Sequence, residues 1–299
     1  MKKPIPMLKT ETPSPEHTQL DLYAVDELIA AFIDDQHHAV NAVRAAATQI
    51  AAAVAAAVPR IEAGGRLIYV GAGTSGRLGL LDSVELYPTF SWPHDRALAL
   101  LAGGPQAMYE AIEGAEDNPG QGSADVMAVS AGPHDVVLLL AASGTTPYVM
   151  GALAAARDAG ALTIGIANNP HSPLAEKAEF GITLDTGSEL ISGSTRLKAG
   201  TAQKIALNTF SSALMVRLNK VYGNLMVDLK PTNAKLIRRT INLTMLATGA
   251  DEVLARTTLE ACGFHVKVAI VAIKTNTSIG DARQRLAHAH GSVRLAIAE

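Results

Sequence analysis

The stretch Arg66-Leu-Ile-Tyr-Val-Gly-Ala-Gly-Thr-Ser-Gly-Arg77 decides the fold, because an apolar, strand-like run ends in small residues that lead into a helical pattern. Val136-Val-Leu-Leu-Leu-Ala-Ala-Ser-Gly-Thr-Thr146 repeats this arrangement. Unpaired N–H groups at the start of such a helix, nearby hydroxyls and the helix dipole together favour a phosphate. Neither loop has the Gly-Lys-Ser/Thr ending of a P-loop. Two such loops indicate a small phosphorylated ligand that is held from two sides.

Short apolar runs alternate with helical segments from Arg66 onward, and this alternation predicts an α/β fold with a doubly wound parallel sheet. In such sheets the ligand lies at the carboxyl ends of the strands, where the strand order reverses. The order 2-1-3-4-5 makes the first and third strands neighbours and places both loops at that point. We expect five strands, at 66–70, 97–101, 136–141, 162–166 and 180–184, and helices at 76–86, 105–113, 121–130 and 147–159.

The segments outside this sheet predict two further parts. Residues 1–20 are rich in Pro, Thr and Lys and lack periodicity, which is typical of an extended arm that can wrap a partner subunit. Helices are expected at 22–34 and 39–63, and a long one at 194–220. Short helical segments follow from Lys235 and predict a small bundle. The expected domains are the arm at 1–20, a sheet domain with N-terminal helices at 21–230 and a small helical domain at 231–299.

Composition narrows the class of protein. The 299 residues carry a net charge of −3, with a pI near 6.3, so nucleic acid and anionic membranes are not expected as partners. We find no charge-free apolar run of about 18 residues and no signal-like start, which favours a cytoplasmic protein. Cys262 is the single cysteine, so neither an internal disulfide nor a cysteine-based zinc site is expected.

The spacing Gly71-x-Gly73-x-x-Gly76 also matches the dinucleotide-binding fingerprint. That interpretation needs an acidic residue at the end of the second strand to hold the ribose. The second predicted strand instead ends in Ala102-Gly103-Gly104. A nicotinamide cofactor is therefore not expected, and no other cofactor or metal is predicted.

Several longer motifs resemble the N-acetylmuramic acid 6-phosphate etherase family, over roughly residues 62–275. One of them is similar to the signature that this family shares with the glucokinase regulatory protein. The chain departs from the family pattern after Glu85, where Leu86-Tyr-Pro-Thr89 stands in place of Cys-Pro-Pro-Thr. The motifs are Gly71-Ala-Gly-Thr-Ser-Gly-Arg-Leu-Gly79, Ser83-Val-Glu85, Glu113-Gly-Ala-Glu-Asp117, Ala142-Ser-Gly-Thr-Thr-Pro-Tyr-Val149, the signature Gly187-Ser-Glu-Leu-Ile-Ser-Gly-Ser-Thr-Arg-Leu-Lys-Ala-Gly-Thr-Ala-Gln-Lys204, and Tyr222-Gly-Asn-Leu-Met-Val-Asp228.

The resemblance implies a sugar isomerase-type (SIS) domain with a small C-terminal helical domain, in a homodimer without metal or nucleotide. It implies cleavage of the D-lactyl ether of N-acetylmuramate 6-phosphate to N-acetylglucosamine 6-phosphate and D-lactate, in the recycling of cell-wall muropeptides. The residue that matches Glu85 is the proton donor in the family, and the one that matches Glu116 is the second acid/base.

Other residues are candidates for holding the substrate. Glu189, in the signature loop, can contact the sugar ring. Arg196, Lys198 and Lys204 can supply positive charge or can form structural ion pairs. The substrate-binding candidates are Gly73, Thr74, Ser75, Ser143, Gly144, Thr145, Thr146 and Glu189.

Two alternatives stay open at this point. One is a non-catalytic sugar-phosphate-binding regulator of the SIS family, which has no need for an acid/base pair such as Glu85 and Glu116. The other is an aldose–ketose isomerase, which uses similar loops. Release of lactate separates an etherase from both.

Overall fold

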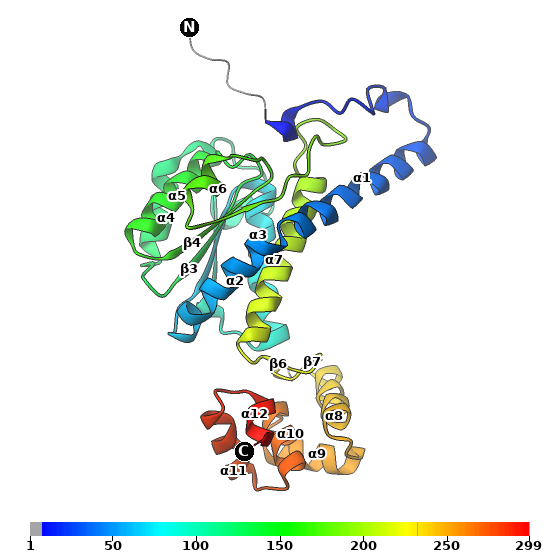
Figure 1. Cartoon of the computed structure of the whole chain (residues 1–299), viewed down its shortest axis with the longest axis vertical. Coiled ribbons are helices and arrows are strands. Elements are labelled where there is room, and N and C mark those ends of the chain that lie inside the picture. Colours follow the sequence, from blue (N-terminus) through cyan, green and yellow to red (C-terminus); the bar gives the residue numbers. More distant parts are fainter. Residues whose placement is uncertain (1–7, 232, 299) are drawn as a thin grey trace. The chain divides into compact units, whose positions relative to one another are not determined.

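The computed structural model describes residues 8–231 and 233–298. Its main element is a five-stranded sheet in which every neighbouring pair is parallel, with the strand order β2-β1-β3-β4-β5. This confirms the predicted doubly wound sheet and its order (Figure 1). The strands are β1 (Leu67–Gly71), β2 (Ala97–Leu101), β3 (Val136–Leu140), β4 (Leu162–Ala167) and β5 (Phe180–Thr183).

The register of the strands brings the two glycine-rich loops together. Gly71, the last residue of β1, pairs with Leu101 of β2 on one side and with Leu140 of β3 on the other. The loops that follow β1 and β3 therefore leave neighbouring strands at the same edge of the sheet. This is the arrangement that lets both loops contact one ligand.

Helices cover both faces of the sheet. Alternate strand residues such as Ile68, Val70 and Val137 form one core with Tyr148 and Val149. In Figure 1, α4, α5 and α6 lie on one side of the strands, and α2, α3 and α7 lie on the other. These helices are α2 (Ala47–Glu62), α3 (Gly73–Phe90), α4 (Pro119–Ala128), α5 (Pro147–Asp158), α6 (Pro173–Lys177) and α7 (Lys198–Arg217).

Three predicted helices differ from the structure. The first helix, α1 (Val25–Ala45), continues through residues 35–38, and the break to α2 falls at Ala46. Only a short 3-10 turn, Pro105–Met108, replaces the helix expected at 105–113. The Arg77 side chain donates hydrogen bonds to the carbonyls of Ala107 (3.0 Å) and Glu110 (3.2 Å), which an α-helix would use for its own amides. The third helix, α7, begins at Lys198 instead of 194.

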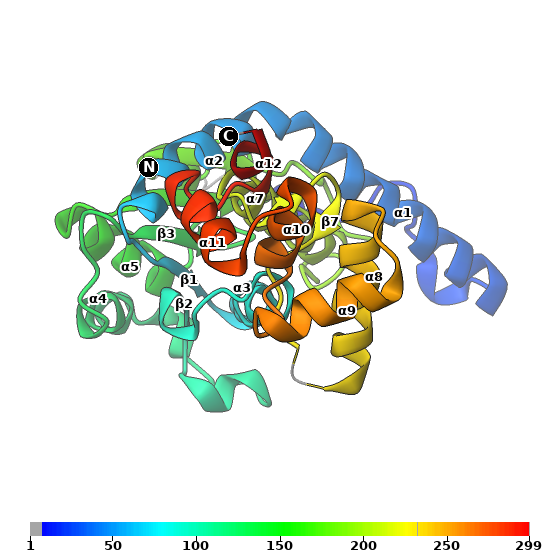
Figure 2. The same ribbon diagram turned by 90° about the horizontal axis from the view of Figure 1, so that it is seen from below.

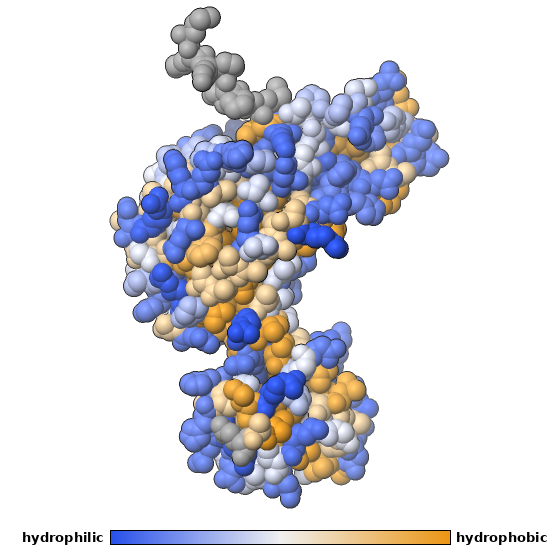
Figure 3. Space-filling view, in the orientation of Figure 1, coloured by the Kyte–Doolittle hydropathy of each residue, from blue (hydrophilic) through white to orange (hydrophobic). Residues whose placement is uncertain are grey.

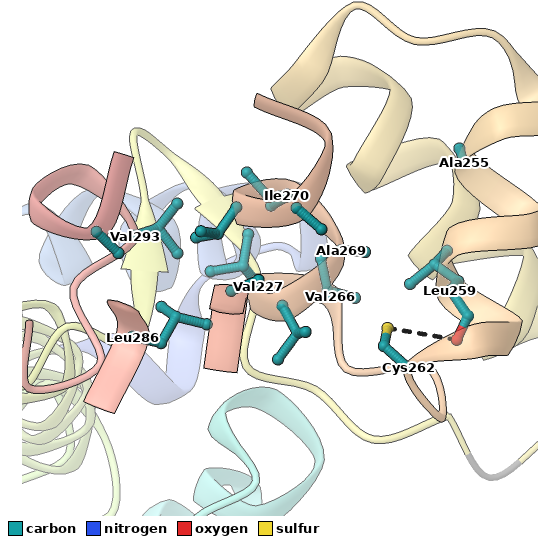
Figure 4. Packing of buried hydrophobic residues seen from close by; sticks show 14 of the residues in the cluster. Val227, Ala255, Leu259, Cys262, Val266, Ala269, Ile270, Leu286 and Val293 are labelled. Atoms are coloured by element: carbon teal, nitrogen blue, oxygen red, sulfur yellow. Dashed lines mark hydrogen bonds between the residues drawn. The ribbon is translucent and has the colours of Figure 1, made fainter. Parts of the chain in front are cut away.

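The chain forms two compact units, and the sheet belongs to the first, which includes residues up to Ser83 and Asp95–Ser211. In the second unit the central helix, α10 (Val266–Thr275), contacts four others (Figure 2). Figure 4 shows its core, where Ile270 and Val266 lie among residues such as Leu286 and Val293. The unit also takes in Val84–His94, with the end of α3, and the end of α7 from Ser212. Its other elements include β6 (Val221–Tyr222), β7 (Leu225–Met226), α8 (Ala234–Thr248), α9 (Glu252–Ala261), α11 (Ile279–His288) and α12 (Val293–Ala298).

Within the described residues, no single helix has both the length and the apolar character needed to cross a membrane. The pair α1 and α2 meets that test when taken together, but the two helices are bent by 53°. Buried residues of α2, among them Ile50, Val54 and Ile61, belong to the core of the first unit.

Candidate active site

The first loop depends on close packing between β1 and α3. A Cβ atom on Gly71 would lie 2.7 Å from the backbone nitrogen of Gly76, so no larger residue fits where the strand turns into the helix. Gly73 opens α3 with a φ of +52°, a conformation that glycine adopts without strain. These glycines place Thr74 and Ser75 in the first turn of α3, where helix N–H groups have no partner within the helix.

The second loop is organised around the hydroxyl of Ser143. Its oxygen accepts hydrogen bonds from the backbone N–H of Thr145 and from the Thr145 hydroxyl, both at 3.1 Å. Thr146 is the N-cap residue of α5, but its side chain makes no capping hydrogen bond. Gly144 has a φ of +71° and packs on Ser172, where a Cβ would lie 2.3 Å from the Ser172 Cβ. The loop therefore presents hydroxyls beside an uncapped helix N-terminus, which suits an anion.

A cavity of about 370 Å³ joins the two loops. It contains most of the predicted binding residues and the predicted catalytic Glu116. It also contains three polar residues, Glu11, Asp117 and Thr195, that the motifs did not single out as ligand contacts. The residues that line it are Glu11, Ala72, Gly73, Thr74, Ser75, Glu116, Asp117, Ala141, Ala142, Ser143, Thr145, Thr146, Pro147 and Thr195.

Glu116 stands at the border of this cavity and a second one. It lies in the 3-10 turn Ala115–Asp117, which follows Gly114 in the left-handed conformation (φ 69°), and it is exposed. The second cavity, of about 300 Å³, shares Ala72, Gly73 and Glu116 with the first. A carboxylate in this place can exchange a proton with groups of a ligand on either side of it.

Glu85 is also exposed, but it lies farther along α3. It lies ten positions after Ser75, which corresponds to about 15 Å along the helix axis. Glu85 is not among the described residues that line the cavity of its own chain. The structure thus brings Glu116 to the two loops, whereas it places Glu85 about three turns away on the helix that carries the first loop.

Glu189 is buried, and its side chain lies against the first residues of α7. Its two carboxylate oxygens accept hydrogen bonds from the backbone N–H groups of Lys198 (3.2 Å) and Ala199 (2.9 Å). Burial raises the pKa of Glu189, and the two backbone hydrogen bonds oppose this shift. Glu189 is not among the described residues that line the cavity, so the contacts present in the structure assign it to capping α7.

Two of the three candidate cations, Lys198 and Lys204, are engaged elsewhere, and the third, Arg196, is exposed. The ammonium of Lys198 pairs with Asp35 of α1 at 2.6 Å, and both side chains are largely buried. Lys204 donates to Asn208 of its own helix. Neither lysine nor arginine occurs among the described residues that line the larger cavity. Attraction for an anion must therefore come from hydroxyls and from the N-terminal ends of α3 and α5.

Glu11 was missed because it lies in the Pro-rich arm, about sixty residues before the first loop, where no periodicity marks it. Thr195 had a signal, since it stands in the hydroxyl-rich run Ser192-Gly-Ser-Thr195. That run predicted the opening of a helix, but the helix begins three residues later and leaves Thr195 in the loop beside the cavity.

Comparisons with known proteins match the chain over nearly its whole length. Residues 49–157 match the glucokinase regulatory protein N-terminal SIS domain, and residues 120–213 match the SIS domain. The chain is 58% identical to the N-acetylmuramic acid 6-phosphate etherase of Deinococcus radiodurans, covering 97% of this chain and 95% of the relative. It is 48% identical to the etherase of Pectobacterium atrosepticum, covering 97% and 96%, and 46% identical to that of Rubrobacter xylanophilus, covering 98% and 96%. A chain that aligns end to end with these relatives at such identity belongs to the N-acetylmuramic acid 6-phosphate etherase family.

Proposed function

We propose that this protein is a carbon–oxygen lyase that cleaves the D-lactyl ether of N-acetylmuramate 6-phosphate, giving N-acetylglucosamine 6-phosphate and D-lactate. The observation that carries the proposal is the cavity that both glycine-rich loops and Glu116 line. A family of etherases at up to 58% identity supplies the choice of substrate.

The reaction uses the open-chain form of the sugar, because the alkoxide that an ether releases is a poor leaving group and the closed ring has no carbonyl to assist its departure. The aldehyde at C1 makes the C2 proton acidic, and the ether oxygen on C3 is then beta to the carbonyl. A base removes the C2 proton, the C3–oxygen bond breaks, and an acid protonates the departing lactate oxygen. Water then adds at C3. Two carboxyl groups can perform these proton transfers, and we assign them to Glu116 and Glu85.

The phosphate is assigned to the hydroxyls of the two loops. Thr74 and Ser75 stand at the start of α3, and Ser143, Thr145 and Thr146 stand before α5. The N-termini of these helices favour a dianion without any lysine or arginine. The phosphate would hold one end of the open-chain sugar while Glu116, at the border of the two cavities, faces the reacting carbons.

We also propose a homodimer. The exposed fractions of Val25, Ile29 and Ile33 are 76%, 55% and 59%, and these residues recur every four positions along one face of α1. Hydrophobic residues also appear over α1 in the space-filling view (Figure 3). Exposed apolar stripes of this kind are typical of an interface between protein chains, and a second copy of this chain is the expected partner.

This dimer would complete the active site. Glu85 lies about 15 Å along α3 from Ser75 of its own chain, beyond the reach of a proton transfer. We propose that Glu85 of one subunit acts at the cavity of its partner. We place the reaction in the cytoplasm, in the recycling of cell-wall muropeptides.

Lactate release from N-acetylmuramate 6-phosphate tests the function. We expect release by the protein after dialysis against a chelator, and a kcat/KM lower by roughly 10²–10⁴ for N-acetylmuramate without phosphate. Ser143→Ala should raise KM for the phosphorylated sugar more than it lowers kcat, because the Ser143 oxygen organises the second loop. Equal rates on the two sugars would contradict the assignment of the loops, and absence of lactate would contradict the function.

A further inference from the structure

A short segment of the N-terminal arm is fixed against the domain that holds the cavity. Thr10 lies within the 3-10 turn Lys9–Glu11 and is fully buried. Its backbone N–H donates to the Asn169 side-chain oxygen at 3.4 Å, and its hydroxyl accepts from the Asn169 amide at 3.0 Å. Figure 1 shows this turn beside the loop that precedes α7. The arm thus has a defined place on its own subunit.

The loop before α7 holds the same segment from the other side. The backbone N–H of Gly193 donates to the carbonyl of Thr10 at 3.1 Å, and the Ser192 hydroxyl donates to the carbonyl of Glu11 at 2.8 Å. The backbone on both sides of the Glu11 side chain is therefore tied to the protein. Ordering a surface segment costs conformational entropy, and these contacts offset that cost.

The contacts that hold the arm also extend to the second glycine-rich loop, which follows β3. The amide of Asn169 that donates to Thr10 donates as well to the carbonyl of Ala142, at 2.9 Å. Ala142 directly precedes Ser143, whose hydroxyl organises that loop. One buried amide therefore connects the arm to the part of the cavity that we assign to the phosphate.

Glu11 lines the cavity, and Gly193 leaves room for its carboxylate. Gly193 has a φ of +79°, and a Cβ atom there would lie 3.0 Å from Oε2 of Glu11. Gly187, in the same loop, has a φ of +70°, but a Cβ there would meet nothing within 4 Å. The two glycines are alike in conformation, and they differ in whether a side chain would touch Glu11.

Chemistry limits what can lie against Glu11. An ionised carboxylate accepts hydrogen bonds and donates none, and it repels other anions. A phosphate cannot pair with it, whereas sugar hydroxyls and an amide N–H can. We propose that Glu11 is a substrate-binding residue, which accepts hydrogen bonds from the hydroxyl or N-acetyl N–H groups of the sugar and so sets the direction in which the sugar lies. This inference rests on the proposed function.

Binding to the full-length protein tests the proposal without any need for turnover. Titration calorimetry with N-acetylglucosamine 6-phosphate and, separately, with inorganic phosphate would compare the wild type with Glu11→Ala. We expect the sugar phosphate to bind about 10–100-fold more weakly to the variant, and inorganic phosphate to bind as tightly as before or more tightly. Glu16→Ala removes an exposed carboxylate of the same arm and should change neither affinity.

The two glycines provide a matched pair of variants. Gly193→Ala should displace the Glu11 carboxylate and weaken binding of the sugar phosphate, while Gly187→Ala, with the same backbone strain, should not. In a Glu11→Ala background Gly193→Ala should have no further effect, because residues that act through one contact are not additive.

The proposal is overturned if Glu11→Ala binds the sugar phosphate as tightly as the wild type. It is also overturned if the variant loses affinity for the sugar phosphate and for inorganic phosphate by the same factor, since equal losses indicate damage to the two glycine-rich loops. A wild-type protein that binds inorganic phosphate but not N-acetylglucosamine 6-phosphate contradicts the proposed function itself, and the inference with it.

Discussion

The phenol of Tyr69 donates a hydrogen bond of 2.8 Å to the buried carboxylate of Asp82. The other Asp82 oxygen accepts from Ser211, at 3.2 Å, and from Asn208. One carboxylate therefore joins β1, α3 and α7. Burial raises the pKa of Asp82 above its ordinary value of 3.8, while the three hydrogen bonds oppose that shift. The network matters for the site because it holds the helix whose first turn carries Thr74 and Ser75.

Tyr69→Phe should destabilise the protein by about 1–3 kcal/mol at neutral pH, because it leaves a buried carboxylate with one donor fewer. The loss should shrink as pH falls through the pKa of Asp82. A raised folded-state pKa means that stability is lost as pH rises through it, and removal of the Tyr69 donor raises that pKa further. Urea unfolding of both proteins at a series of pH values from 8 down to 4, followed by circular dichroism, measures how the loss changes with pH. A loss that stays the same over the whole pH series would contradict the role given to the Asp82 charge.

Glu85→Gln and Glu116→Gln should fail in different ways, although each should lower lactate release by about 10²–10⁴. If Glu85 is the acid, its variant still exchanges the C2 proton with deuterated water while it releases little lactate. If Glu116 is the base, its variant loses both exchange and release. Mass spectrometry of the sugar and a lactate assay give the two rates. Near-normal turnover by either variant removes that residue from the mechanism.

Mixing these two inactive variants tests whether Glu85 acts on the partner subunit. In a mixed dimer one site has both glutamates and the other has neither, so an equal mixture should recover about a quarter of the wild-type rate. Different affinity tags on the two variants allow mixed dimers to be isolated as a control. Mixed dimers that stay as inactive as the separate variants would place both glutamates of a site on one chain.

Oxygen labelling tests which bond breaks. Elimination cuts the bond between C3 of the sugar and the ether oxygen, so the lactate leaves with its original oxygen. In ¹⁸O-water the label should enter the sugar at C3 and be absent from the lactate C2 hydroxyl, as measured by mass spectrometry. Displacement at the lactyl carbon gives the reverse pattern and needs no removal of the C2 proton.

The sheet could be predicted because buried parallel strands are continuous apolar runs, such as those at β1 and β3. The helix expected at 105–113 was wrong because a distant side chain, Arg77, binds the carbonyls of Ala107 and Glu110. No local pattern contains that information. The break in the first helix pair was misplaced for a related reason, since propensity marks helix ends less well than packing does.

The amino-acid sequence by itself determined the strands, their two glycine-rich loops and the hydroxyls that the loops present, because each of these depends on neighbours in the chain. Tertiary structure alone decided which acidic side chains reach the cavity. Glu189, inside the longest motif, caps α7, and Glu85 lies about three turns along α3. Glu11, in a segment without any motif, lines the cavity because Asn169 and Gly193 hold the arm in place. Contacts between residues so far apart in the chain form only when the sheet brings them together.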